Sequence, residues 1–341
     1  MPTKTTNVVI LLLYAMLKEK SSFFFLITSP SLLMIVLLKE MRYNVTEGSD
    51  LMLTLKNDQL EIEVNTHGAE LKRVVKDKRD YLWDGNPEFW GRTSPVLFPI
   101  VGAVANHTYF VNGEEFQLGQ HGFARDMEFE VVDQTNDALW FRLSSSEATR
   151  AKYPFDFELS IGYVLEQNMV TVEWEVVNKG SVTMPFSIGA HPAFMAGPDL
   201  ADYTLQMKDS RTIESYVFDN DRGLVDVAAG KVEIVSSASF LPLSKDLFEK
   251  HPTLILENET GVVLRSATHG REVEVAFEGF PYVGIWSPIN AAGKVAPFVC
   301  VEPWFGMADT SPFSGELAKK KGIELLEGGE KFVARYTMTF R

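Results

Sequence analysis

The sequence has little cysteine: Cys300 is the single thiol among 341 residues, so no disulfide can form within one chain. Its six histidines are scattered, and together with one thiol they show none of the short Cys/His spacings that are typical of zinc sites. The spacing in the sequence therefore indicates no metal site. The lack of disulfides favours a cytoplasmic protein, because structural disulfides accumulate in oxidising compartments.

Positive charge is also scarce. The chain has 32 Lys and Arg residues against 46 Asp and Glu, which gives a net charge of −14 and a pI near 5.0. Nucleic-acid-binding proteins usually carry a basic patch, so this balance argues against a nucleic-acid partner. A hydrophobic content of 45% and a charged content of 23% are typical of a globular protein that handles a neutral small molecule.

From residue 52 onward, short apolar–polar alternations are separated by turn signals. Asn112-Gly113 is the strongest short hairpin signal and lies between expected strands at 108–111 and 115–118. Two further hairpins are expected around 136–137 and 167–168, with strands at 128–132, 138–143, 157–165 and 169–177. Later strands are expected at 203–207, 254–256, 262–264, 273–277, 283–286 and 332–340.

Helical signals are few: a short capped helix is expected at 245–251 after Ser244, and another at 316–321. Many short strands with turns at close spacing indicate a sandwich or a barrel. The length suits one large domain or two ordinary ones, and no low-complexity linker follows residue 50. We predict one all-β domain over residues 51–341, a large antiparallel β-sandwich with few short helices.

His191 is held by a stiff local backbone. Pro192 follows it, fixes its own φ and pushes His191 toward an extended conformation, so the ring should lie at the end of a strand. Such a histidine is either a proton donor tuned by its surroundings or a core histidine bonded to a carbonyl.

Glu302 ends an apolar run and shares strand parity with Phe298 and Cys300, so we expect it on their face. A carboxylate on an apolar face has the setting of a general base with a raised pKa. Its alternative role is to cap the end of the strand.

Three motifs around these residues resemble one family. They are Gly-Ala-His-Pro-Ala-Phe around His191, Cys-Val-Glu-Pro-Trp-Phe-Gly around Glu302, and Gln-His-Gly-Phe-Ala-Arg-Asp around His121. In this order they resemble the motifs of aldose 1-epimerases, the galactose mutarotase family, in the form typical of the LacX-like branch. The resemblance covers residues 51–341. It implies a galactose mutarotase-like supersandwich that interconverts the anomers of a free hexose without any cofactor.

The resemblance also implies roles for individual residues. Glu302 would be the base that takes the proton of the C1 hydroxyl, and His191 the acid that protonates the ring oxygen. We expect their side chains to face each other across a pocket, several ångströms apart with room between them, and His121 to bind the sugar from its wall. His121 could instead be a turn histidine before Gly122.

Five other residues are candidates for substrate binding. Arg125 either binds substrate or forms a local ion pair with Asp126. Trp286 and Trp304 could stack on a sugar face, as could Phe305, although ordinary core packing explains all three equally well. Asp309 could bond a hydroxyl or be exposed to solvent.

One position departs from the branch. The segment Leu97-Phe98-Pro99-Ile100-Val101-Gly102 is normally followed by an arginine that reaches the substrate, but Ala103 stands here. No Lys or Arg lies between Arg92 and Arg125. Two further functions therefore stay open: a sugar-binding protein without efficient turnover, and a relative of hexose-phosphate epimerases, which would need a basic cluster. Ala103→Arg would either restore a sugar contact or clash with a repacked pocket.

Residues 1–50 differ from the rest. Apolar runs at 8–17 and 23–38 are interrupted or short of the 18 residues that a spanning helix requires. Three interpretations are open: non-native upstream sequence with the true start at Met41 or Met52, a membrane anchor, or a degenerate signal peptide. We favour the first, because the family-like region begins at Met52. A membrane partner is expected only if this segment is a native anchor, and the oligomeric state is open.

Overall fold

The computed structural model describes residues 51–197, 199–311 and 315–341. The expectations for residues 1–50 lie outside this part of the chain. None of the helices within the described ranges is long and apolar enough to cross a membrane. Strands dominate these ranges, and their α-helices are the short α3 (Glu147–Arg150) and α4 (Lys245–Lys250).

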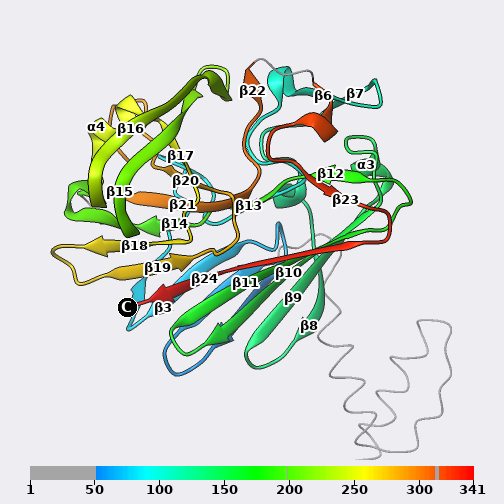
Figure 1. Ribbon diagram of the computed structural model, residues 1–341. Coiled ribbons are helices and arrows are strands. Elements are labelled where there is room, and N and C mark those ends of the chain that lie inside the picture. The colour runs from blue at the N-terminus through cyan, green and yellow to red at the C-terminus, as the bar shows by residue number, and fades with distance from the viewer. Residues whose placement is uncertain (1–50, 198, 312–314) are drawn as a thin grey trace, which may run out of the picture. The chain divides into compact units, whose positions relative to one another are not determined.

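A ten-stranded sheet forms the largest layer, and its strands β8 to β11 and β24 fan out along the lower part of Figure 1. Neighbouring strands pair antiparallel, except that the short β22 runs parallel to β16. In spatial order the strands are β22 (Thr310–Ser311), β16 (Leu224–Pro242), β15 (Tyr203–Asp219), β18 (Gly261–Ser266), β19 (Glu272–Ala276), β24 (Lys331–Phe340), β11 (Met169–Asn178), β10 (Phe157–Glu166), β9 (Ala138–Ser144) and β8 (Glu130–Gln134).

A six-stranded sheet carries the two motifs around His191 and Glu302. Figure 1 shows its strands β13, β20 and β21 above the fan of β24, β11 and β10. Its order is β17 (Thr253–Glu257), β20 (Tyr282–Trp286), β21 (Phe298–Phe305), β13 (Ile188–Ala190) and β5 (Val96–Leu97), and β14 (Ala193–Met195) also pairs with β21.

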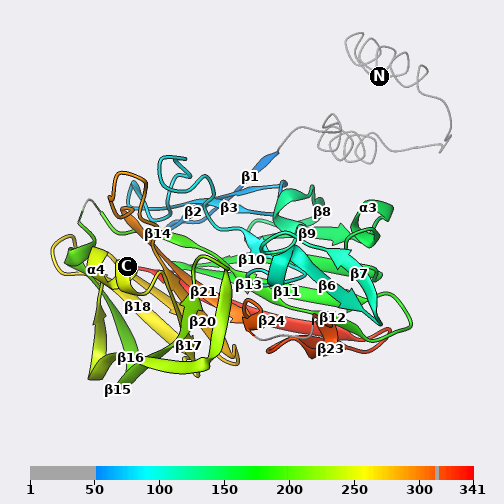
Figure 2. The same cartoon turned by 90° about the horizontal axis from the view of Figure 1, so that it is seen from above.

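Smaller sheets and turns complete the described chain, and Figure 2 shows β1 to β3 at one side of the large sheet. The four-stranded sheet contains β1 (Met52–Lys56), β2 (Glu61–Asn65), β3 (Leu71–Lys76) and β4 (Arg79–Asp80). The two-stranded sheets are β6 (Thr108–Val111) with β7 (Glu114–Gln117), and β12 (Met184–Phe186) with β23 (Glu324–Leu326). Short 3-10 turns lie at Ala105–His107, Ala124–Asp126, Leu200–Asp202 and Leu317–Lys319.

The burial of two strands explains the layering. Along β11 the residues alternate, so that Val170, Val172, Trp174 and Val176 are buried and their neighbours are half exposed. This pattern places one face of the strand on the core and the other toward water. In β21, by contrast, every residue from Phe298 to Trp304 is buried. The strand that carries Glu302 is therefore an inner strand covered on both faces.

The structure confirms the predicted all-β class and its local hairpins. Asn112 and Gly113 both have positive φ, 52° and 82°, as the tight turn between β6 and β7 requires. The capped helix is also present, because the Ser244 side chain accepts a hydrogen bond from the N–H of Leu247 at the start of α4. The expected helix at 316–321 is a single 3-10 turn.

The prediction missed most of one long hairpin and one helix. β15 continues to Asp219 instead of ending near residue 207, and its partner β16 was not predicted. Polar residues and Gly230 in this region look like loop sequence, while the pairing contains several register shifts. The short α3 was also missed; its Ser146 and Thr149 form a reciprocal capping box.

Candidate active site

His191 and Glu302 lie opposite each other on adjacent strands. Gly189 of β13 pairs with Trp304, and Ala193 of β14 pairs with Cys300, which is one continuous antiparallel register along β21. The ladder is interrupted between β13 and β14, where Pro192 has no N–H to donate. On that register His191 falls directly across from Glu302, and cross-strand neighbours point to the same face.

The side chains of this pair touch. Nε2 of His191 lies 3.2 Å from Oε2 of Glu302, and the residues are 6% and 1% exposed. The expectation that they face each other is met, but the expected gap of several ångströms between them is wrong. The cross-strand register causes this, because it brings the two Cβ atoms close enough for direct contact.

Burial favours the uncharged form of each partner. It raises the pKa of Glu302 well above its ordinary value, an effect that the Trp304 side chain opposes. It lowers the pKa of His191 to about 3, and Arg125 and Arg92 act in the same direction. A pair that holds one proton therefore keeps it on the carboxyl group when the site is empty.

Two tryptophans enclose the His191 ring. Trp90 stacks on it with ring centroids 4.6 Å apart and an angle of 28° between the planes. Trp286, from β20, meets it edge-on at 5.5 Å and also meets Trp90 edge-on. Trp286 was predicted at the site, whereas Trp90 was not. Its signal was the local density of aromatic residues at Trp83, Phe89 and Trp90, just before the apolar segment that leads into the site.

His121 lies beside His191, with ring centroids 5.7 Å apart. Its Nδ1 accepts a hydrogen bond from the N–H of Gly102, so the proton of the neutral ring is on Nε2. His121 has a φ of +65°, and a Cβ at the next residue, Gly122, would come within 2.2 Å of the carbonyl oxygen of Phe98. Burial, followed by the charge of a protonated His191, lowers the pKa of His121 well below its ordinary value. The ring is thus a neutral donor placed by a turn that only glycine fits.

Arg125 is joined by a second arginine that was not predicted at the site. Nη2 of Arg125 donates to the carbonyl oxygen of Gln120 at 2.8 Å, and its Nε lies 3.7 Å from Asp126. Nη2 of Arg92 donates to the other oxygen of Asp126 at 2.6 Å. Both cations lower the pKa of His121 and His191, after the effect of burial. The local ion pair expected at Arg125 is present, and it is part of a small cluster at the site.

Trp304 lies on the face of β21 that carries Glu302, two residues away. Its indole crosses two glycines, since an added Cβ would come within 2.5 Å of it at Gly189 and within 2.4 Å of it at Gly284. Gly284 pairs directly with Glu302. Both strand positions require glycine, because the indole occupies the space that a side chain would fill. The ring of Phe305, by contrast, packs against Phe280 and Phe332, which is ordinary core packing.

Asp309 is fully buried rather than exposed. Its Oδ2 accepts a hydrogen bond from the N–H of Ala105 at 3.0 Å, and its own N–H donates to the carbonyl oxygen of Ala103. Burial raises its pKa, and the charge of the buried Lys320 opposes this shift. Asp309 therefore holds the segment that begins with Ala103, which is itself only 7% exposed.

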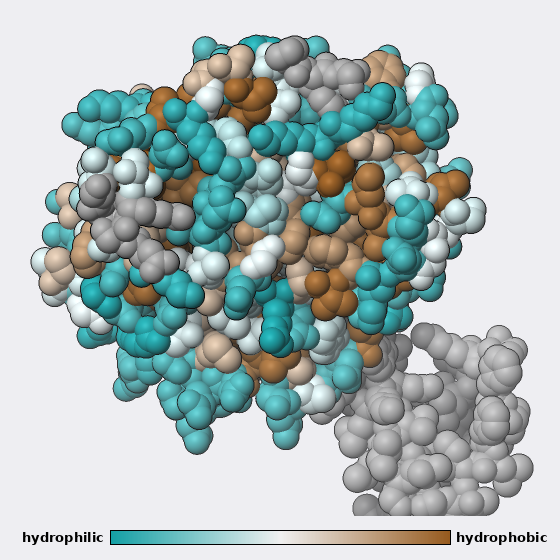
Figure 3. All heavy atoms as spheres, in the orientation of Figure 1, coloured by the Kyte–Doolittle hydropathy of each residue, from teal (hydrophilic) through white to brown (hydrophobic). Residues whose placement is uncertain are grey.

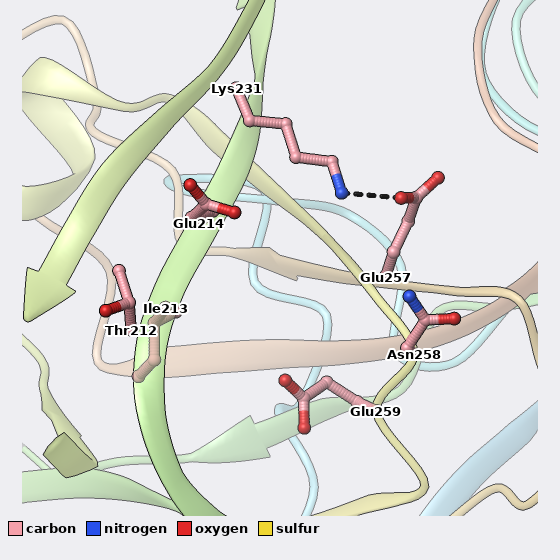
Figure 4. A pocket seen from close by; sticks show the side chains of 7 residues that line it. All are labelled: Thr212, Ile213, Glu214, Lys231, Glu257, Asn258 and Glu259. Atoms are coloured by element: carbon pink, nitrogen blue, oxygen red, sulfur yellow. Dashed lines mark hydrogen bonds and ion pairs between the residues drawn. The ribbon is translucent and has the colours of Figure 1, made fainter. Parts of the chain in front are cut away.

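A polar hollow lies elsewhere, beyond the end of β17. Figure 4 shows its lining, in which Lys231 pairs with Glu257 at 2.5 Å. None of its seven lining residues is one of the residues predicted for the site. The face drawn in Figure 3 is mainly hydrophilic with apolar patches between.

The described chain is thus an all-β sandwich whose inner strands place a buried histidine directly opposite a buried glutamate. The chain belongs to the aldose 1-epimerase family, whose model matches residues 52–320. Within that family it is a LacX-like member. It is 30% identical over 284 residues to the plasmid-encoded protein LacX of Lactococcus lactis subsp. lactis, covering 80% of this chain and 93% of that protein.

Solved structures agree with this assignment. A galactose mutarotase related enzyme from Lactobacillus acidophilus matches with a TM-score of 0.80 and 35% identity over 85% of this chain and 97% of its own. A galactose mutarotase-like protein from Lactobacillus casei matches with a TM-score of 0.80 and 29% identity over 85% and 100% of the two chains. The supersandwich predicted from the motifs is therefore the fold of this protein.

Proposed function

We propose that this protein is an aldose 1-epimerase that interconverts the α and β anomers of a free aldohexose by opening and reclosing the sugar ring. The observation that carries the proposal is the contact between His191 and Glu302, 3.2 Å apart and buried. Membership of the aldose 1-epimerase family supports it independently.

The pair needs only one proton for the whole cycle. With the closed sugar bound, Glu302 as carboxylate takes the proton from the C1 hydroxyl while His191 as imidazolium gives one to the ring oxygen. The C1–O5 bond breaks and an aldehyde forms. The pair is then carboxylic acid and neutral imidazole, the form that burial favours. After rotation about C1–C2, the same transfers in reverse close the ring on either face.

Direct contact between acid and base suits this reaction. The hydroxyl oxygen and the ring oxygen are both bonded to C1, so both can be reached from neighbouring positions on one protein surface. When a sugar binds, the proton can pass from Glu302 to His191 across their contact, which forms the carboxylate and the imidazolium that ring opening needs. Each well-placed proton transfer contributes roughly 10²–10⁴-fold to the rate.

Some of the candidate residues are placed to contact a sugar directly, and others support the site by packing or by hydrogen bonding. His121 presents a neutral N–H donor beside His191, and the face of Trp90 or Trp286 suits the apolar face of a sugar. Arg125 can donate to a sugar hydroxyl from the same side. Trp304 acts by packing beside Glu302, and Asp309 acts by holding the backbone at Ala105.

A second candidate is a hexose phosphate as substrate. The sequence alone showed one basic residue for such a site, but the structure adds Arg92, which is linked to Arg125 through Asp126. Two guanidinium groups beside the histidines could pair with a phosphate, because arginine binds phosphate in a bidentate manner.

Polarimetry tests both candidates. Freshly dissolved α-glucose and α-galactose, and separately glucose 6-phosphate, are followed with and without protein. Faster decay of the rotation is expected for a free hexose, and Glu302→Gln should slow it by ~10²–10⁴-fold while sugar binding persists. The matched control is Glu128→Gln, which removes a carboxylate that bonds His67 at 2.8 Å on the surface. Sugar binding without any acceleration would instead indicate a non-catalytic sugar-binding protein.

A further inference from the structure

A third donor stands beside the acid–base pair. Cys300 is the single cysteine of the chain and is fully buried. It precedes Glu302 by two residues on β21, so both side chains point to one face. One donor atom from each of His191, Cys300 and Glu302 can be chosen so that all lie within 4.8 Å of one another.

We propose that these three residues form a binding site for a thiophilic divalent cation such as Zn²⁺, and that the bound cation blocks the acid–base pair. Imidazole, thiolate and carboxylate are the ligands that zinc prefers, at bond lengths of about 2.0–2.3 Å. Donor atoms in such a tetrahedral site lie roughly 3.3–3.8 Å apart.

The observed spacing of the donor atoms approaches this geometry. Nε2 of His191 and Oε2 of Glu302 are already 3.2 Å apart. The thiol is the donor that has farther to move, and its cross-strand partner on β14 is the small residue Ala193. On the other side its partner is Trp286.

Charge balance also favours the cation. A thiolate and a carboxylate are costly to bury as anions, but together they neutralise one dication. Three protein ligands leave the fourth position open for water or a sugar hydroxyl, as in sites that are not purely structural. With the lone pairs of Glu302 and His191 on the metal, neither residue can carry the proton that ring opening needs.

Cobalt tests the site directly in the full-length protein. Co²⁺ bound to a thiolate gives a ligand-to-metal charge-transfer band in the near ultraviolet, and with one cysteine in the chain any such band reports Cys300. We expect one equivalent of Co²⁺ to produce the band and Zn²⁺ to displace it. Cys300→Ser and Cys300→Ala should abolish it and weaken Zn²⁺ binding at least ~100-fold, more than the loss of an outer-shell partner does.

The matched control is His67→Gln, which removes the histidine of the exposed His67–Glu128 pair and should leave the band and the affinity unchanged. Melting curves show whether the cysteine variants are folded. The absence of a charge-transfer band in the parent protein overturns the proposal, as does Zn²⁺ affinity that survives in a folded Cys300 variant.

Inhibition is a separate measurement that rests on the proposed function. Zn²⁺ should suppress mutarotation in the parent protein and do so at least ~100-fold less effectively in Cys300→Ala. If the protein shows no mutarotation at all, the cobalt band still decides whether the metal site exists. If mutarotation is present and the zinc-bound protein turns over at the normal rate, the proposal that the cation blocks the acid–base pair is wrong.

Discussion

Nε2 of His191 and Oε2 of Glu302 lie 3.2 Å apart because one antiparallel register continues on both sides of the break at Pro192. The strand ladder, rather than a loop, therefore sets the distance between acid and base. Sites built on strands are held more exactly than sites on loops. The two groups act as one unit that holds a single proton, so removing His191 should leave the Glu302 carboxyl group without a base to take its proton.

The first prediction concerns that coupling. In His191→Gln the carboxyl group of Glu302 keeps the pKa that burial raises, but it loses the base that can take its proton. At neutral pH it is then protonated and cannot act as base, so the rate should fall by ~10²–10⁴-fold. The residual rate should rise with pH as Glu302 ionises.

A profile of kcat/KM against pH for His191→Gln checks whether the residual rate rises with pH. His67→Gln, which changes an exposed histidine bonded to Glu128, should behave like the parent protein. A residual rate that falls as pH rises would show that Glu302 acts as an acid rather than as a base in the rate-limiting step.

The second prediction concerns the glycine opposite the glutamate. A Cβ at Gly284 would come within 2.4 Å of the Trp304 indole, so Gly284→Ala must displace the ring beside Glu302. We expect a loss of roughly 1–3 kcal/mol in the free energy of unfolding from this overpacking, together with reduced turnover. Gly91→Ala is the control, since an added Cβ there meets nothing within 4 Å. Equal stability of the two variants in urea unfolding would contradict the packing that we describe.

Local features of the fold were predictable from sequence, and long-range ones were not. Asn112-Gly113 encodes its own turn, and Ser244 its own cap. The β15–β16 hairpin was missed because its stability comes from cross-strand pairing through register shifts, which no local pattern shows.

The site shows the same division. The motifs identified His191 and Glu302, but their contact depends on a register between distant strands. Strand parity predicted Cys300 on the face of Glu302, but only the structure shows that His191 lies with both of them. Trp90 and Arg92 reach the site through loops whose path is set by tertiary packing, so only the structure could place them.

The third prediction concerns a buried lysine. Lys320 is 2% exposed, its Nζ donates to the carbonyl oxygen of Met307, and burial lowers its pKa to about 8. Between that value and the ordinary value of 10.5, the unfolded chain binds a proton that the folded chain does not. The free energy of unfolding should therefore rise with pH over this range, by up to about 1.4 kcal/mol per pH unit for one group.

Lys320→Met should remove this contribution. Urea unfolding at about pH 7.5 and about pH 9.5 should show a larger gain, or a smaller loss, for the parent protein than for the variant. Lys319→Met changes the exposed neighbour and should follow the parent protein. The same pH dependence in the parent protein and in Lys320→Met would mean that Lys320 keeps an ordinary pKa.

The last prediction concerns Ala103, where the resembling proteins place an arginine. Ala103 is 7% exposed, and its carbonyl oxygen accepts a hydrogen bond from the N–H of Asp309. A Cβ added at Gly223 would lie 3.7 Å from the Cβ of Ala103. The turn between β15 and β16 therefore packs close to the position that an arginine would occupy. The positive charge near Asp309 comes from Lys320 and not from an arginine at position 103.

Ala103→Arg should consequently destabilise the protein, by roughly 1–3 kcal/mol, because the longer side chain must displace this turn. We expect the Michaelis constant for a free hexose to rise or stay unchanged rather than fall. Ala228→Arg, at an exposed position of β16, controls for the added charge and should leave both quantities unchanged. If Ala103→Arg instead binds sugar more tightly at unchanged stability, position 103 faces the substrate and the pocket has kept room for the missing arginine.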